Sequence, residues 1–581
     1  MLLPPLKSSS DDNGRSTLEI TMICSASLLL ILTLCGLASN ASFPPSGPDP
    51  AIGAVSSLDA RCSRIGTDVL LKGGNAADAI IATEFCVGVI GMYLTGIGGG
   101  GFAVIRNSRG DYEFIDFRES APAASNETMF TADPDASSTG GLASGVPGEL
   151  RGLQYLHRKY GSLPWDNLIE PSIAVARDGF VVGKDLEFGM DYINNDELFL
   201  SSPWRPDFAP RGRRVKAGDV MTRKRYANML QVIRDKGADA FYTGKLAGQV
   251  VSAIQSAGGI MTLEDLANYK VKSRPLVKLE FGEYRLVTSG TPSGGIVGLS
   301  ILNTFKRYQH TEDLSMINLT AHRLVETFRF GYGARTELGD PDFHPEILEY
   351  QKRLLSKETA EKIKSRILDD RTQPVEAYNP EGLEILETPG TSHISTADAS
   401  GMAVSLTSTI NLAFGSQVMV PALGVIMNNE MDDFSVPNRS NAFGFISSPS
   451  NYIRPGKRPL SSMSPYIVEF SANKSLAMVI GGAGGSRIIT ATVQGLLNVL
   501  NRQMNAVSAV QEPRIHDQLV PNQLLFEYTY DNSTRASLIK KGHKSGWQVH
   551  GSDLQVVRLL PNGTFEAAGE TRQHESGGFA V

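Results

Sequence analysis

The chain has 581 residues, of which 41% are hydrophobic and 20% are charged. This length exceeds one ordinary hydrophobic core, so one large domain or two interleaved domains are expected, and the composition is that of a globular protein. The formal net charge of −6 argues against nucleic-acid binding, and no phosphate-binding P-loop motif occurs.

The N-terminal region contains an uncharged run, 20–38, that is rich in leucine and isoleucine and long enough to cross a bilayer. Lys7 and Arg15 precede this run, and the next basic residue is Arg61, so the positive-inside bias places the N-terminus in the cytoplasm. A cleaved signal peptide is the alternative, because small residues end the run, but its basic region would be unusually long. We therefore expect a cytoplasmic tail, a transmembrane signal-anchor and a stalk, over 1–19, 20–38 and 39–50.

Two features of the remaining chain agree with an extracellular location. Cys24 and Cys35 lie in the apolar run, which leaves Cys62 and Cys86 as the pair expected to form a disulfide in an oxidising compartment; two buried thiols are the alternative. The N-x-S/T sequons, which are candidate glycosylation sites, are Asn40, Asn126, Asn318, Asn438, Asn473, Asn532 and Asn562.

After the stalk, the pattern over 51–89 predicts helix interrupted at Gly73, with Asn75 capping the second part. A glycine-rich run follows at 96–101, but it lacks the G-x-G-x-x-G spacing of a phosphate-binding loop. Close packing of backbone beside a strand is therefore the favoured interpretation of these glycines.

Alternation over 112–117 predicts a strand that delivers Arg118. By itself, an arginine followed by Glu119 is most often a surface ion pair. Helical periodicity then recurs over segments that include 149–160, 226–236, 245–257, 263–269, 322–338 and 346–368.

A polar loop, 369–390, leads to two alternating segments, 391–397 and 402–410, which predict a pair of strands. Between them, Ala399, Ser400 and Gly401 suit a three-residue hairpin loop whose last position needs a left-handed glycine. This register places Thr391 opposite Thr409.

Several long motifs in and beyond this hairpin resemble those of γ-glutamyltransferases, and the resemblance extends from about Ala54 to the C-terminus. It implies a mixed α/β (α+β) fold, the four-layer αββα sandwich of N-terminal nucleophile hydrolases, formed by two chains cut from one precursor. The large subunit of the ectodomain would be 51–390 and the small catalytic subunit 391–581. The motifs are TSHIS from Thr391, TSTINLAFGS from Thr407, NNEMDDF from Asn428, PLSSMSP from Pro459 and GGAGGSR from Gly481.

The resemblance also implies a mechanism. Cleavage of the Gly390–Thr391 bond would give Thr391 a free α-amine that acts as the base for its own hydroxyl. Thr409, if opposite, would hydrogen-bond that hydroxyl, and the backbone N–H groups of Gly484 and Gly485 match the family's oxyanion hole. His393 invites a Ser/His-type interpretation, but the terminal amine already supplies the base, so a structural role is favoured.

The implied substrate is a γ-glutamyl compound, whose α-amine and α-carboxylate are both free. A metal site at Glu430, Asp432 and Asp433 is the weaker interpretation, because no histidine–carboxylate spacing supports it; neither a metal nor a cofactor is predicted. The residues that match the family's ammonium-binding set are Asn411, Glu430 and Asp433. Those that match its carboxylate-binding set are Arg118, Ser461 and Ser462.

The expected function is hydrolysis of glutathione and its conjugates, with the γ-glutamyl group passing to water or to an amino acid or dipeptide. An acylase of the same fold and an uncleaved, inactive surface binding protein are the alternatives. The chain departs from many animal relatives at Ala413, where an aromatic residue is common, and Ser464 replaces the cysteine of some relatives. The first difference predicts a more open or differently covered substrate pocket.

Overall fold

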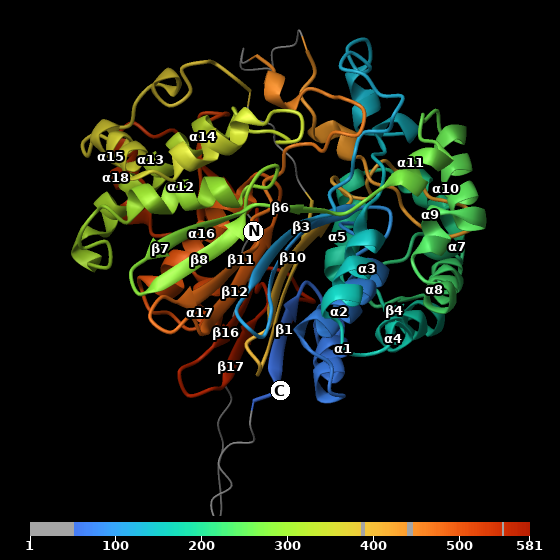
Figure 1. Ribbon diagram of the computed structural model, residues 1–581. Coiled ribbons are helices and arrows are strands. Elements are labelled where there is room, and N and C mark those ends of the chain that lie inside the picture. Colours follow the sequence, from blue (N-terminus) through green and yellow to red (C-terminus); the bar gives the residue numbers. More distant parts are fainter. Residues whose placement is uncertain (1–50, 385–389, 438–445, 549–550) are drawn as a thin grey trace, which may run out of the picture. The chain divides into compact units, whose positions relative to one another are not determined.

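The computed structural model describes residues 51–384, 390–437, 446–548 and 551–581 (Figure 1). The predicted tail, signal-anchor and stalk lie outside these residues. Within them, no helix combines the length and the apolar character needed to span a membrane.

A seven-stranded sheet contains the predicted hairpin, β9 and β10, near its centre. β9 and β10 pair antiparallel with Ser392 opposite Ser408, and Gly401 in the connecting loop has a φ of +79°, which confirms the predicted register and the left-handed glycine. In spatial order the strands are β18 (Gly577–Ala580), β1 (Gly53–Ser57), β9 (Ser392–Asp398), β10 (Ala403–Thr409), β2 (Gly100–Arg106), β3 (Tyr112–Asp116) and β6 (Lys272–Arg274).

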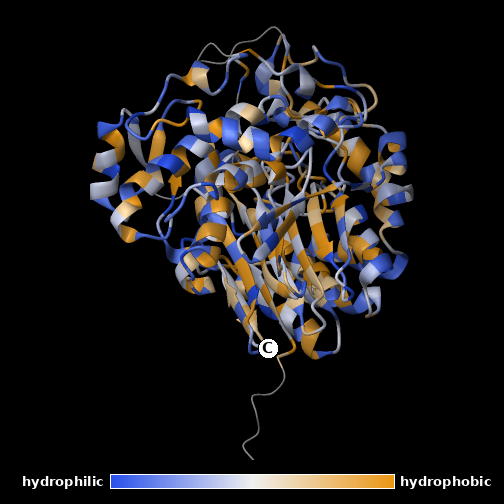
Figure 2. Ribbon diagram, turned by 60° about the vertical axis from the view of Figure 1, so that its left-hand side comes forward, coloured by the Kyte–Doolittle hydropathy of each residue, from blue (hydrophilic) through white to orange (hydrophobic). Residues whose placement is uncertain are grey.

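A six-stranded antiparallel sheet packs against the first, with β12 lying on β9 and β10. Side chains such as Phe102, Val104, Val479 and Val557 fill the space between the sheets, and Figure 2 shows hydrophobic residues running along these central strands. The order is β17 (Phe565–Ala568), β16 (Asp553–Leu559), β12 (Leu476–Ala483), β11 (Tyr466–Phe470), β8 (Tyr284–Ser289) and β7 (Leu276–Phe281).

Helices cover the outer face of each sheet, which confirms the αββα sandwich. Over the seven-stranded sheet lie α1 (Ala60–Leu71), α2 (Ala76–Ile90) and α3 (Glu149–Tyr160), with α4 (Trp165–Asp178) and α8 (Lys224–Lys236) behind them. Over the six-stranded sheet lie α12 (Gly295–Phe305) and α16 (Arg487–Leu500), with α13 (Ile317–Arg335), α15 (Lys357–Arg366) and α18 (Asn532–Lys540) further out.

Shorter elements complete the molecule. The remaining helices are α5 (Lys184–Ile193), α6 (Asp196–Leu200), α7 (Arg205–Phe208), α9 (Asp239–Tyr242), α10 (Gly244–Ser256), α11 (Leu263–Asn268), α14 (Glu346–Leu354) and α17 (Ala506–Gln511). The remaining strands form two small sheets, from β4 (Phe180–Val181) and β5 (Val220–Met221), and from β13 (Ile515–His516), β14 (Leu524–Glu527) and β15 (Ser545–Gln548).

The prediction of helix over 51–89, interrupted at Gly73, is wrong at its start, where β1 forms. All five residues of β1 are buried, so its sequence carries no alternation between a wet and a dry face to identify a strand. The helix begins only after Asp59, whose carboxylate accepts hydrogen bonds from the N–H groups of Arg61 and Cys62. The predicted cap at Asn75 is confirmed, since its side chain forms a capping box with Asp78.

The disulfide is confirmed: Cys62 of α1 and Cys86 of α2 are joined, and both are buried. Among the sequons, Asn40 and Asn438 lie outside the described residues. Asn318 is half-buried in the first turn of α13, and the exposed ones are Asn126, Asn473, Asn532 and Asn562.

Candidate active site

The peptide bond between Gly390 and Thr391 lies at the start of β9, against the end of β10. Thr391 is only 4% exposed, and its hydroxyl donates a hydrogen bond to the carbonyl oxygen of Gly390, the residue before it. Gly390 has a φ of +116°, and a Cβ there would lie 2.0 Å from the carbonyl oxygen of Asn411. The local backbone therefore requires glycine and brings the hydroxyl onto the bond that precedes it.

Thr409 occupies the predicted place but makes a different contact. Its hydroxyl lies 3.5 Å from the Gly390 carbonyl oxygen and accepts a hydrogen bond of 2.7 Å from the N–H of Asn411. The expected bond to the Thr391 hydroxyl is not formed in this uncut chain. Both threonine hydroxyls instead contact one carbonyl oxygen, that of Gly390.

Arg118 follows β3 and is buried, with 1% exposure. Its guanidinium contacts Glu430 and Asp433, both in the 3₁₀ turn η5 (Glu430–Asp433). Its backbone is held as well, since its N–H donates to Asp116 at 2.9 Å and its carbonyl accepts from Tyr269 at 2.7 Å. The alternative of a surface pair with Glu119 is wrong, because the sheet carries Arg118 into the interior.

Burial dominates the electrostatics of this cluster. It raises the pKa of Glu430 and of Asp433 against the opposing charge of Arg118, and it raises the pKa of Glu119 to about 7. Burial disfavours charge on Arg118, but Glu430 and Asp433 outweigh it and raise the arginine's pKa. Arg118 thus faces three carboxyl groups, and Arg335 adds its charge only at Asp433; the excess of acid favours a ligand ammonium group.

Several polar atoms around this cluster have no hydrogen-bond partner among the described residues. Two acceptors are Oε2 of Glu430 and Oδ1 of Asp433, and two donors are Nε of Arg118 and the Ser462 hydroxyl; both carboxyl oxygens of Glu119 are unpartnered as well. Buried polar atoms normally have hydrogen-bond partners, so unpartnered ones need a physical explanation. A zwitterionic ligand would supply donors to the first pair and acceptors to the second.

The predicted residues converge on one small cavity of about 10 Å³, room for roughly one water molecule. Gly484 alone of the predicted set is not in its wall; its φ of +115° and the nearby Gly551 carbonyl exclude any other residue there. The wall is formed by Arg118, Gly390, Thr391, Thr409, Asn411, Glu430, Asp433, Ser461, Ser462, Met463, Gly485 and Ile488. Because Gly390 belongs to this wall, its departure would enlarge the cavity.

Two asparagines that the sequence analysis did not single out hold the turn in place. Asn428 accepts from the N–H groups of Gly145 and Glu430 at 2.9 and 3.0 Å. Asn429 accepts from the N–H of Leu412 at 2.9 Å. Both asparagines belong to the NNEMDDF motif, but from sequence only the acidic residues of that motif suggested a role in binding. Asp432, left ambiguous by sequence, turns away from the cavity to the hydroxyls of Ser137 and Ser138.

The two departures from the relatives have different surroundings. Ala413 is half-buried, packs against the hydrophobic core and is not in the cavity wall, so a wider pocket there stays a prediction. Ser464 is buried, and its hydroxyl donates to the carbonyl of Ser462 at 2.9 Å. Ser464 therefore supports the loop that carries a predicted carboxylate-binding residue.

His393 has the structural role favoured from sequence. It lies between the sheets, with Nδ1 2.8 Å from the Thr407 hydroxyl and Nε2 3.1 Å from the Ser395 hydroxyl. A Cβ at Gly481 would lie 2.3 Å from its ring. The imidazole thus fills a site that glycine opens on β12.

This burial predicts acid sensitivity. It lowers the pKa of His393 to about 3, whereas the unfolded chain binds a proton near pH 6.5. Because of this histidine, the free energy of unfolding should therefore fall by about 1.4 kcal/mol for each pH unit below 6.5. His393→Asn should reduce that slope in denaturant unfolding between pH 7 and 5. An unchanged slope in His393→Asn would contradict the account.

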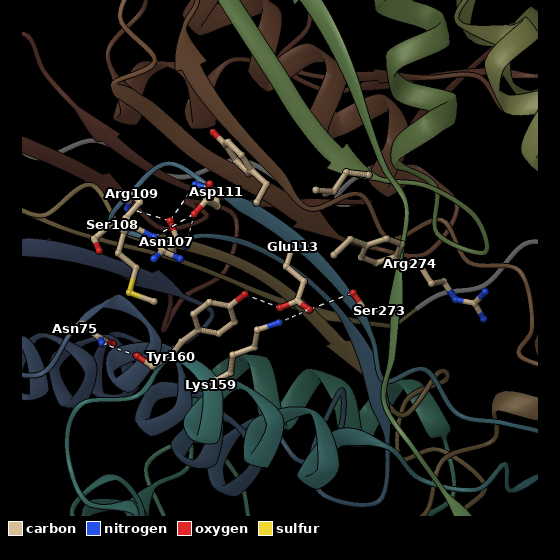
Figure 3. Close-up of a pocket in the computed structure, with 14 residues that line it drawn as sticks. Asn75, Asn107, Ser108, Arg109, Asp111, Glu113, Lys159, Tyr160, Ser273 and Arg274 are labelled. Carbon is tan, nitrogen blue, oxygen red and sulfur yellow. Dashed lines mark hydrogen bonds and ion pairs between the residues drawn. The ribbon is translucent and has the colours of Figure 1, made fainter.

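A wider cleft of about 700 Å³ lies elsewhere, lined by residues of β3, α3 and β6 (Figure 3). At its centre Glu113 accepts hydrogen bonds from Lys159, Tyr160 and Ser273. Its principal acid is thus already satisfied by the protein. The wide cleft does not contain the predicted nucleophile, and its size alone gives it no catalytic role.

Comparisons with known proteins identify the family of this chain. A family model described as gamma-glutamyltranspeptidase matches residues 62–580. The chain is 50% identical over 553 residues to a glutathione hydrolase proenzyme of Arthroderma benhamiae, covering 93% of this chain and 94% of that protein. It is 44% identical over 561 residues to a glutathione hydrolase of Aspergillus flavus, covering 95% and 94%. A crystal structure of cephalosporin acylase from Bacillus halodurans, 24% identical, matches with a TM-score of 0.78 over 94% of this chain and 99% of that one, which shows the shared fold. The chain therefore belongs to the γ-glutamyltranspeptidase family.

Proposed function

We propose that the protein is a glutathione hydrolase and γ-glutamyltransferase that uses Thr391 as its nucleophile after cutting its own chain. The observation that carries this proposal is the Thr391 hydroxyl, held on the Gly390 carbonyl oxygen beside the cavity with unsatisfied donors and acceptors. The relatives named glutathione hydrolase support the choice of substrate.

Self-cleavage would begin when the Thr391 hydroxyl oxygen attacks the Gly390 carbonyl carbon. The C–N bond then breaks, the nitrogen takes the proton, and an ester joins Gly390 to the threonine oxygen. Water hydrolyses that ester, which leaves a carboxylate on Gly390 and a free α-amine on Thr391. This amine can accept the hydroxyl proton in each later turnover.

Gly390→Ala should slow this cleavage strongly. The added Cβ would meet the Asn411 carbonyl oxygen at 2.0 Å, and φ is +116°, a region that alanine avoids. The scissile carbonyl must therefore move away from Thr391. A time course of precursor loss on a denaturing gel measures the effect, and processing at the wild-type rate would contradict the geometry.

Gly382→Ala is a matched control for that experiment. Gly382 also has a positive φ, +63°, but a Cβ there has no neighbour within 4 Å. Its replacement carries backbone strain of about 1–2 kcal/mol without a clash, so its processing should follow the wild type.

In turnover, Thr391 would attack the γ-carbonyl of a γ-glutamyl compound, and the released amine would take the threonine proton. Gly485, and Gly484 behind it, are proposed to supply N–H groups to the oxyanion. Water or an acceptor amine then removes the γ-glutamyl group. Asn411, Glu430 and Asp433 would bind the substrate ammonium, and Arg118, Ser461 and Ser462 its carboxylate.

The two proposed subunits share both large sheets. β1, β2, β3 and β6 would come from the large subunit, whereas β9, β10 and β18 would come from the small one, and the second sheet divides in the same way. A cut at Gly390 therefore leaves the subunits joined by paired strands as a heterodimer.

We further propose that the enzyme is anchored in the cell membrane by 20–38, with its catalytic part outside. The basic residues before that run, the disulfide and the exposed sequons support this location. Glycosidase digestion should shift the mobility of the fragment before Thr391. Recovery of all activity as soluble protein that begins near residue 39 would instead favour a cleaved signal peptide.

Substrate choice separates this function from an acylase. Glutaryl anilide keeps the carboxylate of γ-glutamyl anilide and differs from it only in lacking the α-amine. Without that group, the buried residues proposed to bind the ammonium would have no partner. The kcat/KM for glutaryl anilide should therefore be lower by on the order of 10⁴-fold. Comparable rates on both anilides would favour the acylase, and no turnover of either compound or of glutathione would favour the inactive binding protein.

A further inference from the structure

A second cluster of reactive side chains lies outside the active site. His322 and Glu326 stand one turn apart on α13, and His543 follows α18. All three are buried, with exposures of 0%, 0% and 4%. One ligand atom from each lies within 4.8 Å of the other two. The first two residues precede the Gly390–Thr391 bond and the third follows it.

Outer contacts orient two of these side chains. Nε2 of His322 lies 2.8 Å from the Leu368 carbonyl oxygen. Because a carbonyl oxygen can only accept, Nε2 carries the proton and the Nδ1 lone pair faces the cluster. The Tyr378 hydroxyl donates to Oε2 of Glu326 at 2.6 Å, which leaves Oε1 facing inward. Hydrogen bonds on the outer atoms are the usual supports of metal ligands.

The inner atoms have nearly the spacing of a tetrahedral metal site. Nδ1 of His322 lies 2.9 Å from Nε2 of His543, and that nitrogen lies 3.7 Å from Oε1 of Glu326. Zinc–ligand bonds of about 2.0–2.1 Å give ligand–ligand distances of about 3.3 Å. These two distances differ from that value by about 0.4 Å, and all three ligand atoms lie within 4.8 Å of one another, so side-chain shifts without a change of backbone would complete the coordination.

Without an ion the cluster is a hydrogen-bonded pair of imidazoles with two unsatisfied atoms. Nε2 of His543 would donate to Nδ1 of His322. Oε1 of Glu326 and Nδ1 of His543 then have no hydrogen-bond partner among the described residues. A buried carboxylate oxygen without a donor is costly, and a cation would satisfy it.

We propose that His322, Glu326 and His543 bind one divalent transition-metal ion, with zinc the best match to two imidazoles and one carboxylate. A water molecule would complete the tetrahedron. The ion joins α13 to the segment after α18, and so links the chain on the two sides of Gly390–Thr391. Its role is structural, because none of its ligands lines the cavity at Thr391. The site does not depend on the proposed function, since the uncut chain already assembles it.

Expression of the full chain in cobalt-supplemented medium tests the site, because buried ligands must take up the ion during folding. We expect one cobalt per chain after dialysis and strong visible absorption between about 500 and 700 nm, typical of tetrahedral cobalt. Glu326→Gln and His543→Gln should abolish both signals. Tyr378→Phe removes only an outer support and should lower cobalt affinity by about 10–100-fold.

Two controls make the result decisive. His574→Gln alters an exposed histidine that lies 3.1 Å from Asp185, so unchanged cobalt content there excludes adventitious surface binding. If the ligand variants fail to fold, the Tyr378→Phe affinity still tests the site. The proposal is overturned if the folded wild type holds no cobalt or zinc, if Glu326→Gln retains the wild-type content and spectrum, or if Tyr378→Phe retains the wild-type cobalt affinity.

Discussion

Thr391→Ala should yield a single full-length chain without γ-glutamyl activity. The hydroxyl that contacts the Gly390 carbonyl would be missing, so neither cleavage nor acyl transfer has a nucleophile. Removing a catalytic nucleophile costs on the order of 10⁶-fold in kcat. Denaturing gels and glutamate release from glutathione measure the two losses. Because alanine fits the buried strand position, the uncut chain should fold.

Thr391→Ser is the matched control, because it keeps the hydroxyl and removes one methyl group. It should still cleave and retain part of the activity. Normal two-chain processing of Thr391→Ala would show that another protease makes the cut. Full glutathione hydrolysis by that variant would remove Thr391 from the mechanism altogether.

Arg118→Gln should lower kcat/KM by the equivalent of about 2–5 kcal/mol, the usual loss when one member of a buried charge pair is removed. The structure adds a second effect. Glu430 and Asp433 would lose the cation that contacts both of them, so we also expect a fall in thermal stability. Anilide kinetics on the fraction that has cleaved separate the catalytic loss from misfolding.

Two variants define the outcome. Arg118→Lys keeps the charge and should recover stability better than kcat/KM, because an ammonium group cannot reproduce two parallel hydrogen bonds. Arg109→Gln breaks an exposed pair with Asp111 and should leave kinetics unchanged. Near-wild-type kcat/KM in cleaved Arg118→Gln would exclude Arg118 from substrate binding.

Local patterns predicted the centre of the molecule well. The alternation of the two strands and a glycine loop were sufficient to place Ser392 opposite Ser408, because register in a hairpin is set by its turn and its buried faces. β1 was missed for the opposite reason, since both of its faces are buried and no alternation remains.

Contacts between segments far apart in the chain could not be predicted from local sequence patterns. Arg118 and Asp433 are 315 positions apart, and only the folded sheet shows that Arg118 pairs with η5 rather than with its neighbour Glu119. His322 and Glu326 are one helical turn apart in the sequence, but His543 lies 221 positions from His322, so the third ligand could not be found without the fold. Apart from Gly484, the residues chosen from the family motifs line one cavity, but their contacts in the uncut chain required the structure.

The central claim is that Thr391 carries the γ-glutamyl group during turnover. Acid quenching of the cleaved enzyme in steady state with γ-glutamyl anilide, followed by mass spectrometry of its peptides, tests this claim directly. We predict one added γ-glutamyl group on the peptide that begins at Thr391, as an ester that hydroxylamine removes. An adduct on another residue, or turnover with no adduct under conditions where deacylation limits the rate, would contradict it.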